Sequence, residues 1–307
     1  LLFLGLTLLV YFIGASTNGA ARWINILGFN LQPSEGLKVA TILFMARQLA
    51  SRQNGIEKLA IIPSLNPVRW WKEPRQQAIW REGTIPILGP VLVSSVVIFP
   101  AHTSSSFLVF ATSLVMMLIG RVKIGELVKL VSIVAVALLV VTQLNLGRSQ
   151  TAGGRVETWI KTWVEPRADV PLEELSDTER SMIAIYNGGV TGLGAGRSAM
   201  RVEVTHPESD YAFALFVEEY GLIMAALLLM LYLWIFFRAI VIFQNCGTAF
   251  PGLLVLGLAL MITSQALLHI MVTTNLMPET GQTLPLISRG GSSMLFTSIA
   301  LGMILSV

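Results

Sequence analysis

The sequence has little cysteine and little charge, and both shortages exclude classes of protein. Cys246 is the only cysteine, which excludes an intramolecular disulfide framework and a thiolate metal cluster. Charged residues make up 13% of the 307 positions, whereas an ordinary soluble domain has roughly 25%. A single globule surrounded by water would need more charge to cover its surface. The composition, 54% apolar, therefore predicts a protein whose solvent is largely lipid.

Eight apolar runs are long enough, or nearly so, for the ~20 residues that a bilayer helix requires. They lie at 1–14, 34–51, 84–99, 104–119, 127–145, 211–240, 251–272 and 283–307. Because the runs are continuous and do not alternate, they predict an all-α, polytopic transmembrane helical bundle and not a barrel. The third and fourth runs meet at Pro100, as a tight hairpin or as two half-helices. We expect one transmembrane domain over 1–307, truncated at both ends.

The basic residues predict the orientation of the bundle. The segment 47–83 is rich in Lys and Arg, and the turn 121–129 adds three more, so both should be cytoplasmic. Counting helices from there places 145–211 outside, as a large extracytoplasmic loop. Trp70, Trp71 and Trp80 among the basic residues predict a segment that lies against lipid headgroups. The net charge is only +3, and no nucleic-acid partner is expected.

Charged residues at membrane depth are functional candidates, because their burial in hydrocarbon is costly. Glu35 and Lys38 are three residues apart after Pro33, so they share a helix face and can pair. A helix start would explain Pro33 and Glu35 without any function. The depth of Lys38 favours the functional interpretation.

A second set opens the helix that follows the long loop. Ser209 fits an N-cap, which leaves Asp210 in the first turn, where the helix dipole favours its ionised form. An ionised carboxylate at the mouth of a cavity can act as a general base, although a second capping acid is the simpler interpretation. Glu218 and Glu219 lie two turns deeper and need cationic partners. The candidates for those partners are Lys38 and Arg22.

Three further motifs each allow a structural and a functional interpretation. The glycine-rich run 187–196 lacks the Lys-Ser/Thr of a P-loop, so we expect flexible backbone that packs near a substrate. The segment 277–293 is either a broken helix entrance packed by Gly and Ser, or an anion site with Arg289. Arg22 beside Trp23 is either a phosphate clamp or an arginine that snorkels near an aromatic anchor.

Taken together, five motifs resemble the shape, elongation, division and sporulation (SEDS) family, the FtsW/RodA polytopic membrane proteins of bacteria. They occur in the family's order over nearly the whole chain. The motifs are Gly19-Ala-Ala-Arg22-Trp23-Ile, Gln32-Pro33-Ser34-Glu35-x-x-Lys38, Ile183-Ala-Ile-x-x-Gly188-Gly189-x-x-Gly192, Ser209-Asp210-Tyr-x-Phe-Ala-x-x-x-Glu218-Glu219-x-Gly221 and Pro278-x-Thr-Gly281-Gln-Thr-Leu-Pro285-x-x-Ser288-x-Gly290-Gly291-Ser292.

The resemblance implies ten helices, the first two of which are absent here, in the bacterial inner membrane with the active site facing the periplasm. It implies a peptidoglycan glycosyltransferase that polymerises lipid II and releases undecaprenyl diphosphate. The expected partners are a class B penicillin-binding transpeptidase and other divisome or elongasome membrane proteins. No cofactor or metal site is required by the sequence, although a divalent cation could assist the diphosphate.

The resemblance also assigns roles to residues. Asp210 takes the place of the family's essential aspartate and is the expected base. The expected substrate-binding residues are Arg22, Glu35, Lys38, Glu218, Glu219, Gly281, Gln282 and Ser288. Gln282 is more typical of the division branch, that of FtsW, than of the elongation branch.

Four residues depart from the family's pattern and place the chain in a divergent branch. His102 lacks a usual carboxylate or amide, Arg180 replaces a Gln, His269 replaces an Asn, and Arg289 replaces an aromatic residue. Two other functions stay open. One is a flippase for lipid-linked precursors. The sequence shows no internal repeat of the kind that many transporters have, which argues against it. The other is a non-catalytic scaffold for a transpeptidase.

Overall fold

The computed structural model describes residues 2–13, 15–17, 20–26, 29–58, 60–64, 72–143, 149–164, 171 and 174–307. The chain divides into two compact units. The first unit comprises Leu1–Gly147, Ala239–Met261 and Ile299–Val307. The second unit comprises Arg148–Arg238 and Ile262–Ser298.

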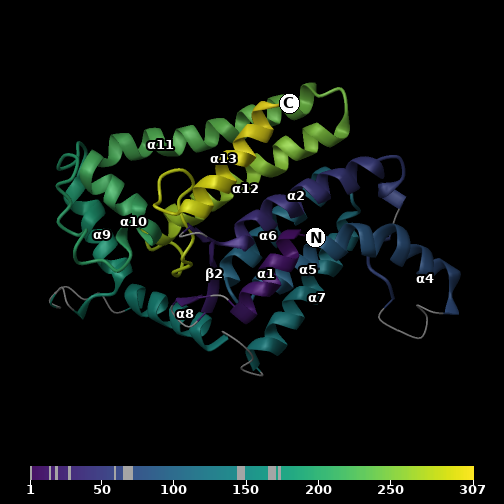
Figure 1. The fold of residues 1–307 in the computed structure, drawn as a ribbon, viewed down its shortest axis with the longest axis horizontal. Helices are drawn as coiled ribbons and strands as arrows, with labels where there is room; N and C mark the ends of the chain where they lie inside the picture. Colours follow the sequence, from purple (N-terminus) through teal and green to yellow (C-terminus); the bar gives the residue numbers. More distant parts are fainter. Residues whose placement is uncertain are drawn as a thin grey trace. The chain divides into compact units, whose positions relative to one another are not determined.

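The described residues are predominantly helical, so the predicted all-α class is confirmed (Figure 1). A π-helical segment, η2 (Ile79–Leu88), joins α4 to α5, and a short 3-10 turn, η1 (Ile56–Lys58), follows α2. The α-helices are α1 (Leu2–Ile13), α2 (Pro33–Ser51), α4 (Pro74–Ala78), α5 (Gly89–Ile98), α6 (Thr103–Ile119), α7 (Ile124–Gln143), α8 (Ser149–Val164), α9 (Asp177–Gly188), α10 (Pro207–Asp210), α11 (Ala212–Asn245), α12 (Ala249–Thr273) and α13 (Gly291–Leu305).

Several of these helices suit a bilayer. Four described helical segments are long and apolar enough to cross a membrane by length and composition. They are Pro74–Ile98, Ile124–Val141, Ala212–Asn245 and Ala249–Thr273. Leu2–Phe12, Thr103–Ile119 and Gly291–Leu305 are shorter apolar helices.

Helix α2 is central to the first unit, where it packs against α1, α5 and α6. Ile42, Met45 and Leu49 on this helix are completely buried. A hydrogen bond of 2.7 Å between the hydroxyl groups of Thr41 and Ser94 joins α2 to α5. The charged N-terminal half of α2 is therefore held within a packed helical core.

Helices α5 and α6 pack against each other and are joined by the short turn 99–102. They therefore form a tight hairpin, one of the two arrangements that the sequence left open. His102 ends the turn, and its Nδ1 accepts a hydrogen bond of 3.4 Å from the backbone N–H of Ser105. The imidazole thus caps α6 in the way that a carboxylate or amide would.

Part of the segment 47–83 is tied to the start of α7. The Glu126 carboxylate accepts hydrogen bonds from the backbone N–H groups of Ile61 and Ile62, at 3.0 and 2.9 Å. Trp80 lies in η2, whereas Trp70 and Trp71 fall outside the described residues. The prediction that these tryptophans face lipid headgroups stays a prediction.

The segment after α1 is a small sheet, which the sequence did not predict. Strands β1 (Ala15–Thr17), β2 (Ala20–Ile26) and β3 (Phe29–Leu31) pair antiparallel in that order. Asn25 lies opposite Asn30, and their side chains form a hydrogen bond of 3.0 Å. Three strands this short give a weak sequence signal, because strand propensity depends on cross-strand packing.

The last apolar run was predicted to be helical from 283, but α13 begins only at Gly291. Pro285 disfavours helical backbone at the preceding residue and lacks the N–H that a helix interior needs. Leu286 then adopts a φ of 66°, in the left-handed region. The Ser288 hydroxyl accepts a hydrogen bond of 2.8 Å from the Leu284 N–H, which closes a turn instead of a helix.

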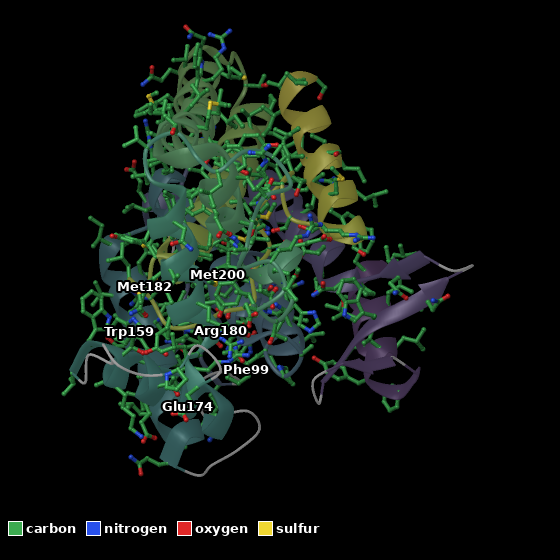
Figure 2. All side chains as sticks on the ribbon, turned by 90° about the vertical axis from the view of Figure 1, so that its left-hand side faces the viewer. Phe99, Trp159, Glu174, Arg180, Met182 and Met200 are labelled. Carbon is green, nitrogen blue, oxygen red and sulfur yellow. The ribbon has the colours of Figure 1, made fainter. Side chains whose placement is uncertain are left out.

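The long segment between α7 and α11 is partly helical. It contains α8, α9 and α10, and residues that follow α9 help to form a core in the second unit. Met200, labelled in Figure 2, belongs to this core. The buried members are Ala184, Met200, Val204, Tyr211 and Ala214.

The glycine-rich run 187–196 packs backbone to backbone against α11. A methyl group at Gly192 would lie 2.3 Å from the Glu219 carbonyl oxygen, and one at Gly221 would lie 2.4 Å from that of Val190. Helix α11 is broken at Gly221, where φ is 80° and ψ is 173°. Gly192 and Gly221 are therefore needed for this close contact, while the expectation of flexible backbone that packs near a substrate stays a prediction.

Candidate active site

Asp210 lies at the end of the four-residue helix α10 in the second unit. Its carboxyl group is partly exposed, and Oδ1 accepts a hydrogen bond of 2.8 Å from the Ser209 hydroxyl. Ser209 is thus not the N-cap that the sequence predicted. Pro207 begins the helix instead, since its fixed φ suits the first helical position, and His206 precedes it.

A second turn is fastened to the turn that carries Asp210. The Ser288 hydroxyl donates a hydrogen bond of 2.7 Å to the Ser209 carbonyl oxygen. The Arg289 backbone N–H donates to the Glu208 carbonyl oxygen at 2.8 Å. We call these two bonds the latch. Through them, the segment between Pro285 and α13 holds the backbone of the two residues that precede Asp210.

Gly281 and Gln282 lie in the same unit as Asp210. Gly281 has a φ of 62°, and a methyl group placed on it would lie 4.0 Å from Asp210 Oδ2. Gln282 is buried, and its carbonyl oxygen lies 2.7 Å from Nδ1 of His269. His269 Nε2 accepts a hydrogen bond of 3.3 Å from the Phe213 N–H at the start of α11. His269 therefore joins α12 both to Gln282 and to the start of α11.

Two arginines converge on the carboxylate of Glu208. Arg289 Nη1 donates to Glu208 Oε2 at 2.8 Å, and Arg201 donates to Oε1. These side chains border a cavity of about 450 Å³ beside the Asp210 turn. The cavity is lined by Arg201, His206, Pro207, Glu208, Ser209 and Arg289.

The hydrogen bonds from Arg289 and Arg201 lower the pKa of Glu208 below its ordinary value of 4.5. A carboxyl group with a lowered pKa in the folded state contributes stability above its ordinary pKa and loses it as the pH falls through the folded value. We therefore expect Glu208→Gln to lower the thermal unfolding midpoint slightly at pH 7, since the pairs are largely exposed, with a difference from wild type that shrinks below about pH 4. Unfolding scans of both proteins at pH 7 and pH 3.5 measure this, and a constant difference would contradict it.

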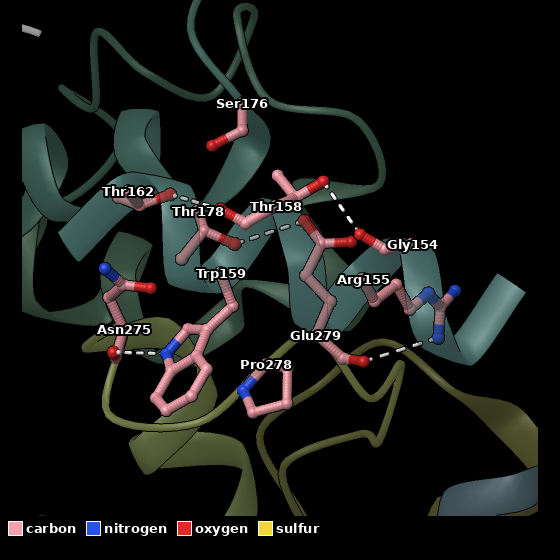
Figure 3. Close-up of a pocket in the computed structure, with 10 residues that line it drawn as sticks. All are labelled: Gly154, Arg155, Thr158, Trp159, Thr162, Ser176, Thr178, Asn275, Pro278 and Glu279. Atoms are coloured by element: carbon pink, nitrogen blue, oxygen red, sulfur yellow. Dashed lines mark hydrogen bonds between the residues drawn. The ribbon is translucent and has the colours of Figure 1, made fainter. Parts of the chain in front are cut away.

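A second cavity, of about 250 Å³, lies in the same unit (Figure 3). Glu279 borders it and accepts hydrogen bonds from the Tyr211 hydroxyl at 2.7 Å and from Thr178 at 3.1 Å. Trp159 donates its indole N–H to the Asn275 carbonyl oxygen at 2.9 Å. Because Tyr211 directly follows Asp210, Glu279 steadies the same stretch of chain as the latch.

Glu218 is completely buried and has other partners than the predicted Lys38 and Arg22. Its carboxylate accepts hydrogen bonds from the Ser198 hydroxyl and from the Ala199 N–H. Glu218 therefore holds the end of the glycine-rich loop on α11. Glu219, its neighbour, is partly exposed.

Glu35 and Lys38 belong to the first unit. Their side chains form an ion pair of 2.8 Å, and Lys38 is 1% exposed, so the predicted pair is present and buried. Arg22 lies on β2, and its side chain falls outside the described residues. The structure thus brings Asp210, Gly281 and Ser288 together within the second unit.

Sequence reasoning missed the roles of Arg201, His269 and Glu279. His269 and Glu279 act through partners distant in the chain, and a single sequence does not show such pairs. Arg201 pairs with Glu208, which is only seven residues away, but the two are joined by a loop with no regular spacing to predict the contact. The only available signal was polarity, because His269 and Glu279 are polar residues next to apolar runs.

The whole sequence, residues 1–307, matches the cell cycle protein family of FtsW, RodA and SpoVE. The chain belongs to this family. It is a multi-pass membrane protein, in agreement with the apolar helices described above. The resemblance drawn from the motifs is thereby confirmed.

Relatives in this family are similar over nearly the whole chain. Stage V sporulation protein E of Bacillus subtilis is 29% identical over 307 residues, which cover 99% of this chain and 76% of that protein. The probable peptidoglycan glycosyltransferase FtsW of Dichelobacter nodosus is 31% identical over 314 residues, covering 99% and 70%.

Solved structures share the fold. A chain of a peptidoglycan synthase complex, solved to describe how polymerisation and crosslinking are coordinated, has a TM-score of 0.68 at 22% identity. That match covers 99% of this chain and 77% of the other. The rod shape determining protein RodA of Thermus thermophilus has a TM-score of 0.58 at 23% identity, covering 99% and 74%. At such identities the likeness establishes the fold alone.

Proposed function

We propose that this FtsW/RodA-family protein is a peptidoglycan glycosyltransferase that polymerises lipid II. Several relatives carry the name probable peptidoglycan glycosyltransferase, which supports this activity. The observation that carries the proposal is the partly exposed Asp210 carboxylate, which lies near Gly281 on a turn whose residues Glu208 and Ser209 line a cavity with two arginines. A carboxylate beside cationic groups suits a reaction that removes a proton and releases an anion.

In the proposed step, Asp210 takes the proton of the acceptor sugar's 4-hydroxyl. The freed oxygen attacks the anomeric carbon of the donor as the bond from that carbon to the diphosphate oxygen breaks. The electron pair leaves with undecaprenyl diphosphate. Nearby positive charge stabilises the leaving group, because its negative charge grows in the transition state.

The predicted substrate-binding residues fall into two groups, those that can face the substrate and those whose side chains are already bound to the backbone. Gly281, Gln282 and Glu219 of the second unit form a wall for the polar heads. Arg22, Glu35 and Lys38 belong to the first unit, and their part in substrate binding stays a prediction. Ser288 and Glu218 hold backbone groups with their side chains, so in this proposal they position the wall. A divalent cation could still assist the diphosphate, and this expectation stays a prediction.

We further propose that the protein works in the bacterial inner membrane with Asp210 facing the periplasm, beside a class B penicillin-binding transpeptidase. The similar fold of a chain from a peptidoglycan synthase complex supports such a partner. Contacts with other divisome or elongasome proteins, and a role in division rather than elongation, stay predictions.

The test is to incubate the purified protein and its transpeptidase with labelled lipid II in liposomes. We expect glycan strands, separated by gel electrophoresis. Lipid II that crosses the bilayer without polymer would instead favour a flippase. If neither polymer nor translocation is observed, the result would favour the non-catalytic scaffold.

A further inference from the structure

The arginine cavity beside Asp210 has a composition that a structural ion pair does not require. Two guanidinium groups meet one carboxylate, so Arg201, Glu208 and Arg289 together carry a net charge of +1. The Arg289 side chain is 84% exposed and that of Arg201 is 50% exposed. Ion pairs with this much exposure contribute modestly to stability. The modest stabilisation expected from the Glu208 carboxylate needs one arginine and does not explain two.

Both arginines keep free hydrogen-bonding capacity. A guanidinium group has five N–H donors in a planar fork, and each arginine uses a single nitrogen on Glu208. Among the described residues, neither guanidinium has another hydrogen-bond or ion-pair partner. Such forks bind phosphate oxygens in pairs, and Glu208 holds both in place for a ligand.

We propose that Arg201 and Arg289, oriented by Glu208, form a site for the diphosphate group of a lipid-linked sugar. The diphosphate has two phosphate groups and the site has two guanidinium groups. Glu208 and Ser209 line the cavity and directly precede Asp210 in the chain, so the turn that carries the base also forms part of this cavity. The identity of the ligand rests on the proposed glycosyl transfer, whereas the anion site itself does not.

Side-chain variants are expected to fold, because the latch consists of other atoms. The Arg289 backbone N–H still donates to Glu208, and Ser288 still donates to Ser209. Arg197 offers a matched control, since it lies in the same loop as Arg201, is exposed and does not line the cavity. Thermal unfolding of every variant checks the fold.

The first measurement is binding of inorganic pyrophosphate to the purified protein by calorimetry. We expect Arg201→Gln and Arg289→Gln each to weaken binding about tenfold or more, because a charged hydrogen bond is lost. Arg289→Lys should fall between wild type and Arg289→Gln, since the charge remains without the fork. Arg197→Gln should bind as wild type does. Unchanged affinity in both glutamine variants would overturn the site.

The second measurement separates a lipid-linked diphosphate from free phosphate. Undecaprenyl diphosphate should inhibit polymerisation of lipid II by the wild type. Its inhibition of the Arg289→Gln variant should be about tenfold weaker. Orthophosphate that binds as tightly as pyrophosphate would contradict a site for diphosphate. If the wild type makes no polymer, the glycosyl transfer fails while the pyrophosphate titration still decides the anion site.

Discussion

Asp210→Asn is expected to reduce polymerisation of lipid II by at least about a hundredfold, because a positioned general base contributes about 10²- to 10⁴-fold to a rate. Asparagine has nearly the same shape, and its Oδ1 can still accept the hydrogen bond from Ser209. The latch does not involve the Asp210 side chain. The loss should therefore appear in kcat, with little change in the thermal unfolding midpoint.

The control for this experiment is Glu203→Gln, which removes one negative charge from an exposed position in the same unit. Glu203→Gln should polymerise lipid II at the wild-type rate. Equal polymer from Asp210→Asn and wild type would contradict the base assignment. A rate loss in Glu203→Gln as large as that in Asp210→Asn would mean that charge alone, and not proton transfer, is responsible.

Gly192→Ala is expected to lower the free energy of unfolding by about 2–5 kcal/mol. The added methyl group would lie 2.3 Å from the Glu219 carbonyl oxygen, and overpacking of this kind costs about 1–3 kcal/mol. The φ of 80° adds about 1–2 kcal/mol, because a side chain disfavours the left-handed region. Chemical unfolding in detergent measures the sum.

Gly196→Ala separates the two causes. Gly196 has a φ of 74° in the same loop, but a methyl group there meets no atom within 4 Å. Gly196→Ala should therefore lower the free energy of unfolding only by the conformational cost of the left-handed region, about 1–2 kcal/mol. Equal losses in Gly192→Ala and Gly196→Ala would show that the contact with α11 does not matter.

Much of the helical architecture could be predicted, because continuous apolar runs are a direct consequence of the lipid solvent. The errors arose where local chemistry overrides composition. Apolar residues continue from Leu284 to Ile287, yet Pro285 and the hydroxyl of Ser288 turn the chain away from a helix. The strands β1 to β3 were missed because their pairing depends on partners and not on a repeating pattern.

The candidate site was predicted unevenly for the same reason. Asp210 stood out through its place at a helix start and through the family motif. The pair of Glu208 and Arg289 is separated by 81 residues, and nothing in one sequence connects them. Ser288 was named as a wall residue, but its bond to the Ser209 carbonyl follows only from the fold.

The two bonds of His269 determine which tautomer the ring adopts. Nε2 accepts from an amide, so the ring's proton is on Nδ1, where it donates to the Gln282 carbonyl oxygen. An asparagine at this position would offer one carbonyl and one NH₂ group, which is the same pairing of acceptor and donor. The histidine that departs from the family's pattern thus supplies the same donor and acceptor as an asparagine, so the two hydrogen bonds at this position do not depend on which of the two residues is present.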